Sequence, residues 1–229
     1  MIKRFPNGEL AVLLLLWVFA TALNLTKAYH IDDTGHLETA RWILLEPWRP
    51  MSGQINWDQN TGPIHLLNQP HLYFYILALW GAIWGFGELP MHLLQSFFTL
   101  ACIILTWRIA KIIVPSRALL TTALVMLSPA FVVGQNLMVD VPLLSLWLAF
   151  FYLLIAPQLK SERRRFLLAG FLAGCACLMK YSSLPLVLVM LLYLAIKRQF
   201  RLIWTVSIPV LMLILWSCWN YLDYGTVHI

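Results

Sequence analysis

Long apolar segments separated by short charged loops are the feature of this sequence that most constrains its fold. Of the 229 residues, 61% are hydrophobic and only 11% are charged. Apolar segments of this kind are typical of membrane-spanning helices, because a helix satisfies its own backbone hydrogen bonds in lipid. The predicted fold is therefore all-α, a polytopic membrane protein with about seven transmembrane helices. The predicted spans are residues 10–25, 90–113, 118–134, 141–156, 166–179, 184–196 and 202–219.

The aromatic-rich segment 72–86 does not fit this series, because it is short for a crossing and interrupted by glycine. If it lies in the outer interface, 12 of the 16 Lys and Arg residues fall on the cytoplasmic side, as the positive-inside rule requires. We therefore predict a cell-membrane protein with a cytoplasmic N-terminus and an outer loop over residues 27–89. Within that loop, segment 34–45 is predicted to be an interfacial amphipathic helix.

The net charge of +6 does not indicate nucleic-acid binding, because the cations are divided among the short loops. The run 160–165 is interpreted as a topological anchor. The four cysteines all lie within apolar segments, so we expect packing residues rather than disulfides or metal ligands.

The first polar stretch after the opening apolar segment contains the adjacent carboxylates Asp32 and Asp33. Side-by-side carboxylates repel one another, and loss of solvent increases the repulsion. One interpretation is structural, with Asp33 or Thr34 as the N-cap of a helix. A cap needs only one such residue, however, and His36 and Glu38 extend the polar group. We therefore predict a capped helix that carries a site, with Asp32 and Asp33 catalytic and with His36 and Glu38 binding substrate.

Three further polar residues are predicted to lie on the same outer side. Asp140 precedes an apolar helix, where an N-cap role and a substrate-binding role are equally well supported. Lys180 is a basic residue on the predicted outer side, where the charge pattern has few cations. One interpretation is a lysine at a helix end whose ammonium reaches the interface, and the other is an ammonium that binds a phosphate. His71, which follows Gln69-Pro70, is a candidate for substrate binding or an interfacial polar residue.

Together these residues suit the transfer of a sugar from a lipid-linked phosphate. Lys180 would neutralise the phosphate as it leaves, and Asp32 or Asp33 would accept the proton of the attacking hydroxyl. Direct displacement by that hydroxyl inverts the anomeric centre. The sequence has no Gly-rich nucleotide-binding loop, so a nucleotide sugar bound in that way is not the expected donor. Asp32 and His36, four residues apart, could share a divalent metal ion, although the sequence offers no confirmed third ligand.

The segment Asp-Asp-Thr-Gly-His-Leu-Glu at 32–38 resembles the acidic motif of GT-C type membrane glycosyltransferases. The most similar group is the superfamily of protein O-mannosyltransferases and aminoarabinose transferases. Segments 68–73, 138–142, 179–181 and 220–225 resemble further outer elements of that superfamily, although Asn68 and Gln69 replace its usual His-Pro.

The resemblance implies a polyprenyl-phosphate sugar donor and a protein, lipid or glycan acceptor. It also implies that Asp32 is the catalytic carboxylate and that Lys180 contacts the donor phosphate. Family members usually continue with further spans and a C-terminal domain, so residues 1–229 are expected to be a single N-terminal core.

The alternative hypothesis is a non-catalytic membrane protein, either a degenerate core that binds the lipid carrier or part of a transport assembly. A transporter is expected to carry ionisable residues in the middle of its spans. Here nearly all carboxylates lie at the ends of spans or in loops, which favours the enzyme.

Overall fold

The computed structural model describes residues 7–56, 60–67, 69–156 and 161–228. Within these residues the chain is almost entirely helical, as the sequence predicted. The helices of the main body are α1 (Asn7–Asn24), α4 (Glu88–Ile113), α5 (Ala118–Met126), α6 (Pro129–Val133), α7 (Asp140–Ile155), α8 (Glu162–Met179), α9 (Pro185–Ile196) and α10 (Ser207–Tyr224). Short 3-10 turns lie at Ile64–Leu66, Pro115–Arg117, Tyr181–Ser183 and Phe200–Val206.

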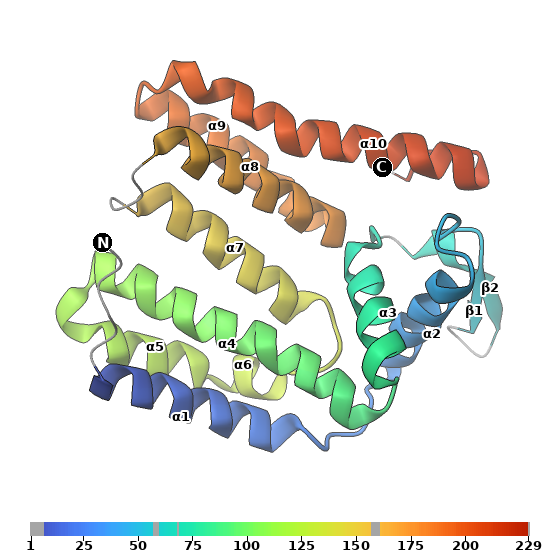
Figure 1. Cartoon of the computed structure of the whole chain (residues 1–229), viewed down its shortest axis with the longest axis horizontal. Coiled ribbons are helices and arrows are strands. Elements are labelled where there is room, and N and C mark those ends of the chain that lie inside the picture. Colours follow the sequence, from blue (N-terminus) through green and yellow to red (C-terminus); the bar gives the residue numbers. More distant parts are fainter. Residues whose placement is uncertain (1–6, 57–59, 68, 157–160, 229) are drawn as a thin grey trace.

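The main body is a row of helices, each packed on the next (Figure 1). Helix α1 packs on α4, α4 on α7, α7 on α8 and α8 on α10, while α5 and α6 cover α1 and α4. Long helices that follow one another along the chain run in opposite directions, so the connecting segments gather at two ends of the row. A large buried apolar cluster joins α2, α3, α4, α7, α8 and α9, and a second cluster joins α1, α4, α5 and α7.

Helix α8 sits between α7 and α10, and two glycines allow this close packing. A Cβ atom on Gly170 would lie 2.7 Å from the carbonyl oxygen of Thr205, and one on Gly174 would overlap the sulfur of Met212. Small residues at such positions let helices approach closely, which is how helices associate where no hydrophobic effect drives them together. The sequence analysis did not identify this Gly-x-x-x-Gly pair.

Helices α2 (Ile31–Leu45) and α3 (Leu72–Trp84) lie across one end of the row together with a small hairpin (Figure 1). Strand β1 (Gln54–Asn56) pairs antiparallel with β2 (Thr61–Pro63), and Ile55 lies opposite Gly62. An all-α prediction does not include this hairpin. It forms because Ile55 can bury its side chain in a third apolar cluster, which also contains Met51, Ile64 and Trp216.

The predicted span 118–134 is wrong as a single helix, because it divides into α5 and α6 at Ser128 and Pro129. Ser128 is extended, with a ψ of 143°, as expected for a residue that precedes proline. Proline also lacks the N–H that would continue α5, so the chain restarts with Pro129 as the first residue of α6.

Two helical stretches, Glu88–Ile113 and Phe200–Tyr224, are long and apolar enough to cross a membrane. Four more helices are apolar but shorter, namely Gly8–Asn24, Leu72–Trp84, Asp140–Ile155 and Tyr181–Ile196. The number of seven spans therefore stays a prediction.

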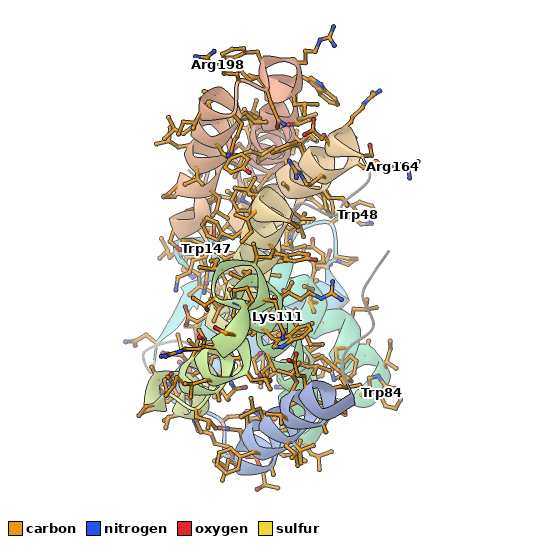
Figure 2. All side chains as sticks on the ribbon, turned by 90° about the vertical axis from the view of Figure 1, so that its left-hand side faces the viewer. Trp48, Trp84, Lys111, Trp147, Arg164 and Arg198 are labelled. Carbon is orange, nitrogen blue, oxygen red and sulfur yellow. The ribbon has the colours of Figure 1, made fainter. Side chains whose placement is uncertain are left out.

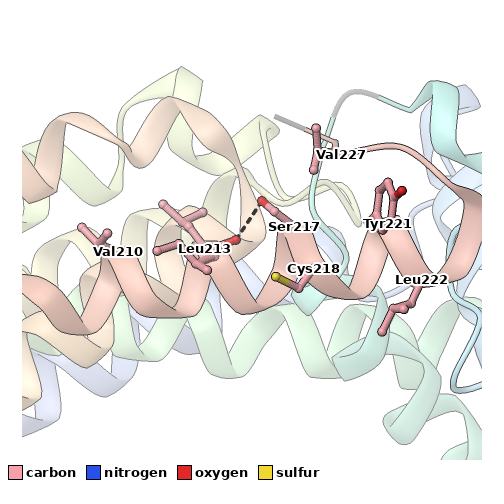
Figure 3. A pocket seen from close by; sticks show the side chains of 8 residues that line it. Val210, Leu213, Ser217, Cys218, Tyr221, Leu222 and Val227 are labelled. Atoms are coloured by element: carbon pink, nitrogen blue, oxygen red, sulfur yellow. Dashed lines mark hydrogen bonds between the residues drawn. The ribbon is translucent and has the colours of Figure 1, made fainter.

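The outer face of α10 carries an apolar groove of about 570 Å³ (Figure 3). Its lining includes Leu213, Ser217, Cys218 and Tyr221. The Ser217 hydroxyl donates a hydrogen bond of 2.9 Å to the carbonyl of Leu213 within the same helix. The groove therefore presents an apolar surface, as a lipid-facing helix requires.

The end opposite α2 and α3 is held by interactions between helix termini, and we call it the basic end. Lys111 Nζ lies 2.6 Å from a carboxylate oxygen of Glu9, joining α4 to the start of α1. Arg165 donates to the carbonyl of Ala156, joining α8 to the end of α7. Figure 2 looks onto this end and labels Lys111, Arg164 and Arg198, which come from α4, α8 and the segment after α9. The residues 1–6 and 157–160, which hold three of the predicted cytoplasmic cations, lie outside the described chain.

Candidate active site

The site end comprises α2, α3, the hairpin, the starts of α4 and α7, and the ends of α1, α8 and α10. Helix α2 begins three residues earlier than an Asp33 N-cap would place it, because its N-cap is His30. The His30 side chain accepts from the backbone N–H of Asp32, and an Asp33 carboxylate oxygen accepts from the backbone N–H of His30 at 2.8 Å. This reciprocal capping box fixes the first turn of the helix.

The structure separates the two adjacent carboxylates by their surroundings. Asp33 is fully buried, and one of its oxygens is occupied in the capping box. Its other oxygen has no hydrogen-bond partner among the described residues. The Asp32 side chain is 34% exposed, and an oxygen lies 3.7 Å from Nδ1 of His30. Asp32 is thus accessible to a reactant, whereas Asp33 is engaged in holding the helix.

His36 is buried on the next turn of α2, at 2% exposure. Its Nδ1 donates to the carbonyl of Leu137 at 3.2 Å, and its Nε2 accepts from the Gln69 amide at 3.3 Å. Burial lowers the pKa of His36, and the Leu137 carbonyl and nearby carboxylates oppose that shift only in part. A neutral imidazole agrees with these contacts, since one nitrogen donates and the other accepts.

Asp140 and Lys180 form an ion pair across the end of the row. Lys180 Nζ donates to Asp140 Oδ1 at 3.0 Å, and the two side chains are 38% and 54% exposed. The N-cap interpretation of Asp140 is wrong, because Val139 is the cap residue and Asp140 is the first residue of α7. Lys180 is the C-cap of α8 in an extended conformation. An exposed pair of this kind contributes little stability, so both groups are available to a charged ligand.

These groups converge through His36. Leu137, whose carbonyl bonds to His36, lies three residues before Asp140, so α2 is adjacent to the start of α7. The loop 137–139 that leads into α7 contacts His36 through the Leu137 carbonyl. The sequence analysis placed the acidic pair, Asp140 and Lys180 on one side of the molecule, and the structure brings them to one end.

Two other predicted site residues have different surroundings. An oxygen of Glu38 accepts from the backbone N–H of Asn56 at 2.9 Å, so this carboxylate fastens the hairpin to α2. His71 is completely buried at the N-cap of α3, against Phe74 and Trp216. Neither ring nitrogen of His71 has a hydrogen-bond partner among the described residues, and burial lowers its pKa to about 3. Asn68, from the same motif, lies outside the described chain.

The described residues do not fit a metal ion at Asp32 and His36. Both ring nitrogens of His36 already contact Leu137 and Gln69. Across the ranges given above, no group of three or more His, Cys, Asp or Glu side chains is arranged to hold a cation. A zinc site normally has at least three protein ligands, and the mechanism below uses only residues of this chain.

Asp223 and Asn220 are two buried polar residues at the site end that were not among the predicted site residues. Asp223 has a fully buried carboxylate that accepts from the backbone N–H of Met51 at 2.7 Å and lies 3.7 Å from Arg49 Nε. Asn220 is fully buried one turn earlier, and its side-chain atoms have no partner within the described chain. Both lie in the segment 220–225, whose charged and amide residues at the end of an apolar helix were the available signal.

The fold and this site define a class of protein. Its members are membrane proteins of packed helices, with a site across one end of the row that contains carboxylates and a lysine. A family model described as dolichyl-phosphate-mannose-protein mannosyltransferase matches residues 68–221. That match covers more than half of the chain, and the chain therefore belongs to this family. No curated protein matches the chain.

The fold is similar to that in the crystal structure of ArnT from Cupriavidus metallidurans bound to undecaprenyl phosphate. The TM-score is 0.66 and the sequence identity is 18% over 94% of this chain. The matched region is 40% of the ArnT chain, so this chain spans less than half the length of that protein. Both findings agree with the resemblance drawn from the sequence motifs.

Proposed function

We propose that this protein transfers a sugar from a polyprenyl-phosphate donor to an acceptor hydroxyl on the extracytoplasmic side of the membrane. The observation that carries the proposal is the position of Asp32, His36, Asp140 and Lys180 at one end of the helix row. Asp32 and His36 share α2, His36 bonds to the loop before α7, and Lys180 pairs with Asp140. The ArnT structure, which has the same fold, was solved with undecaprenyl phosphate, which supports a lipid phosphate as the donor carrier.

Lys180 is proposed to bind the donor phosphate. In the described chain its ammonium pairs with Asp140, and the exposure of both side chains leaves room for a phosphate to compete for it. An ammonium that stabilises charge on a departing phosphate lowers the barrier to breaking the glycosidic bond. A salt bridge in water is weak enough for this exchange.

An apolar cavity near the end of α8 supports a lipid donor. It has a volume of about 410 Å³, lies between α3, α8 and α10, and is lined by residues that include Leu72, Leu178 and Trp216. Leu178 lies two residues before Lys180. A prenyl chain bound in this cavity would hold its phosphate close to the end of α8.

Asp32 is proposed to act as the general base. It is the accessible member of the acidic pair, whereas the Asp33 carboxylate is held in the capping box. The Asp32 carboxylate accepts the proton of the acceptor hydroxyl as the oxygen attacks the anomeric carbon and the bond to the donor phosphate breaks. Attack from the face opposite the phosphate inverts that carbon. His36 is buried and both of its ring nitrogens are engaged by Leu137 and Gln69, so it does not compete for the proton.

The test is sugar transfer by the purified protein in lipid from a panel of undecaprenyl- and dolichyl-phosphate sugars. Asp32→Asn is expected to lower kcat by roughly 10²- to 10⁴-fold, the contribution of a general base. Asp33→Asn is the matched control, because it removes the same charge one residue away and should lower kcat much less. Equal kcat values for Asp32→Asn and the unmodified protein would refute the assignment. Donor binding without transfer from any donor would favour the non-catalytic alternative.

A further inference from the structure

The segment that follows α10 turns back toward the end of α8. Gly225 has a φ of +85°, a left-handed conformation that glycine adopts without strain, and its N–H donates to the carbonyl of Tyr221. Such a residue ends a helix and reverses the chain direction. Three residues later, the ring of His228 lies 5.7 Å from the ring of Tyr181, centroid to centroid.

His228 takes part in a chain of hydrogen bonds that connects three segments. The indole N–H of Trp216 donates to the Tyr181 hydroxyl at 3.0 Å, and that hydroxyl donates to Nδ1 of His228 at 2.9 Å. The Nε2 N–H of His228 in turn donates to the carbonyl of Leu67 at 2.9 Å. Helix α10, the turn after α8 and the loop before α3 are thereby held together.

Both segments that His228 joins carry residues of the proposed site. Tyr181 directly follows Lys180, whose extended backbone lies between α8 and a 3-10 turn. Leu67 lies two residues before Gln69, whose amide contacts His36. A lysine side chain has four rotatable bonds and does not hold its ammonium in one place by itself. A fixed backbone at Lys180 therefore limits where the ammonium can lie.

We infer that His228 is a positioning residue, which holds Lys180 for the donor phosphate by fixing the hydroxyl of Tyr181. The inference rests on the proposed function, because it takes Lys180 as the phosphate ligand. His228 acts through Tyr181 and touches neither reactant. Its two ring nitrogens have distinct tasks, since Nδ1 accepts and Nε2 donates, so the ring must be neutral. Burial lowers the pKa of His228, which agrees with that requirement.

The experiment measures the Kd of undecaprenyl phosphate for the whole protein in lipid nanodiscs. His228→Ala and Tyr181→Phe should each raise the Kd by about 3- to 10-fold, the equivalent of one lost hydrogen bond. The double variant should be no weaker than the single variants, because both remove the same connection. In a Lys180→Ala background, His228→Ala should change the Kd no further. A merely structural role would weaken binding in that background as well.

His65→Ala is the matched control, since His65 stacks on Tyr224 near the same turn, with ring centroids 4.9 Å apart, and is not part of the hydrogen-bond chain described here. It should leave the Kd within twofold of that of the unmodified protein. Additive effects of His228→Ala and Tyr181→Phe, an unchanged Kd in His228→Ala, or an equal loss in the Lys180→Ala background would each overturn the inference. If the unmodified protein does not bind undecaprenyl phosphate, the proposed function itself fails.

Discussion

The two ends of the helix row satisfy their polar groups in different ways. At the basic end, most charges meet opposite charges or carbonyls at helix termini, as Lys111 does with Glu9, although Nε of Arg165 and Oε1 of Gln199 are buried there without a hydrogen-bond partner among the described residues. At the site end, several buried polar atoms have no hydrogen-bond partner among the described residues. They are both ring nitrogens of His71, both side-chain polar atoms of Asn220, and one oxygen each of Asp33 and Asp223. All six histidines of the chain also lie at the site end.

This difference indicates where the molecule has accepted a cost in stability. A buried polar atom without a partner costs about 1–3 kcal/mol, and native proteins carry few of them. The contacts described at the basic end hold helix termini together. The concentration of unpartnered groups at the other end agrees with a site that binds a polar ligand.

The largest expected difference between the two ends is their access to a membrane-impermeant maleimide in intact cells. Thr34→Cys places a thiol on the exposed side of α2, and Arg164→Cys places one on the exposed start of α8. We expect labelling at position 34 and none at position 164 until the membrane is made permeable. The unmodified chain, whose four cysteines lie in apolar helices, is the control. Labelling of both positions in intact cells would abolish the distinction between the two faces.

The next largest effect compares one lysine from each end. Lys180→Met should raise the Kd of undecaprenyl phosphate by roughly 10- to 100-fold, since hydrogen bonds to charged groups contribute about 1.5–3 kcal/mol. Lys111→Met removes the same charge at the basic end and should leave that Kd unchanged, although it breaks the pair with Glu9. Equal losses from both variants would mean that bulk charge, and not a phosphate site, governs binding.

The response to acid should originate at the site end. Folding lowers the pKa of His36, His71 and His228 below the usual value for histidine, because burial disfavours the charged ring. The unfolded chain therefore binds protons first, and stability is complete above about pH 6.5 and declines as the pH falls. For His71 the decline continues to about pH 3. Thermal unfolding between pH 8 and pH 4 should show it, and His71→Phe should make the pH dependence shallower. If the unfolding temperature of His71→Phe depended on pH as steeply as that of the unmodified protein, this explanation would be contradicted. The control is His30→Gln, which replaces an exposed histidine and should leave the pH dependence unchanged.

The smallest effect compares the helix caps at the two ends. Asp33 belongs to the capping box of α2, and the Ser161 hydroxyl accepts from the backbone N–H of Arg164 at 3.4 Å to cap α8. Asp33→Ala should cost about 1–2 kcal/mol and Ser161→Ala about 0.5–1 kcal/mol, because the second bond is longer and exposed. Chemical denaturation in detergent micelles measures both. A larger loss for Ser161→Ala would show that the basic end depends more strongly on its caps.

Much of the fold could be predicted from the sequence, because the length and hydrophobicity of an apolar segment predict a helix without any knowledge of tertiary contacts. The bounds of α4 and α7 were predicted to within two residues. Helical segments were also expected where α2 and α3 lie, although their interfacial position stays a prediction. The break between α5 and α6 depends on the local effect of Pro129, and the sequence analysis did not apply it. The hairpin was missed because three-residue strands have too little pattern to detect.

Some residues of the candidate site were recognisable in the sequence, but their arrangement was not. Asp32, Asp33, Asp140 and Lys180 were recognisable because charged residues are rare in so apolar a chain. The pairing of Asp140 with Lys180 joins residues forty positions apart, and no local pattern encodes it. The same is true of the chain of hydrogen bonds from Trp216 through Tyr181 to His228.

The sequence by itself determined that this chain forms apolar helices and that most of its few acidic groups lie outside the apolar segments, because hydrophobicity and helical periodicity are local properties. Only the tertiary structure decided which carboxylate is buried in a cap and which is accessible. Those outcomes depend on how distant helices pack, since burial and hydrogen-bond partners are set by neighbours from elsewhere in the chain.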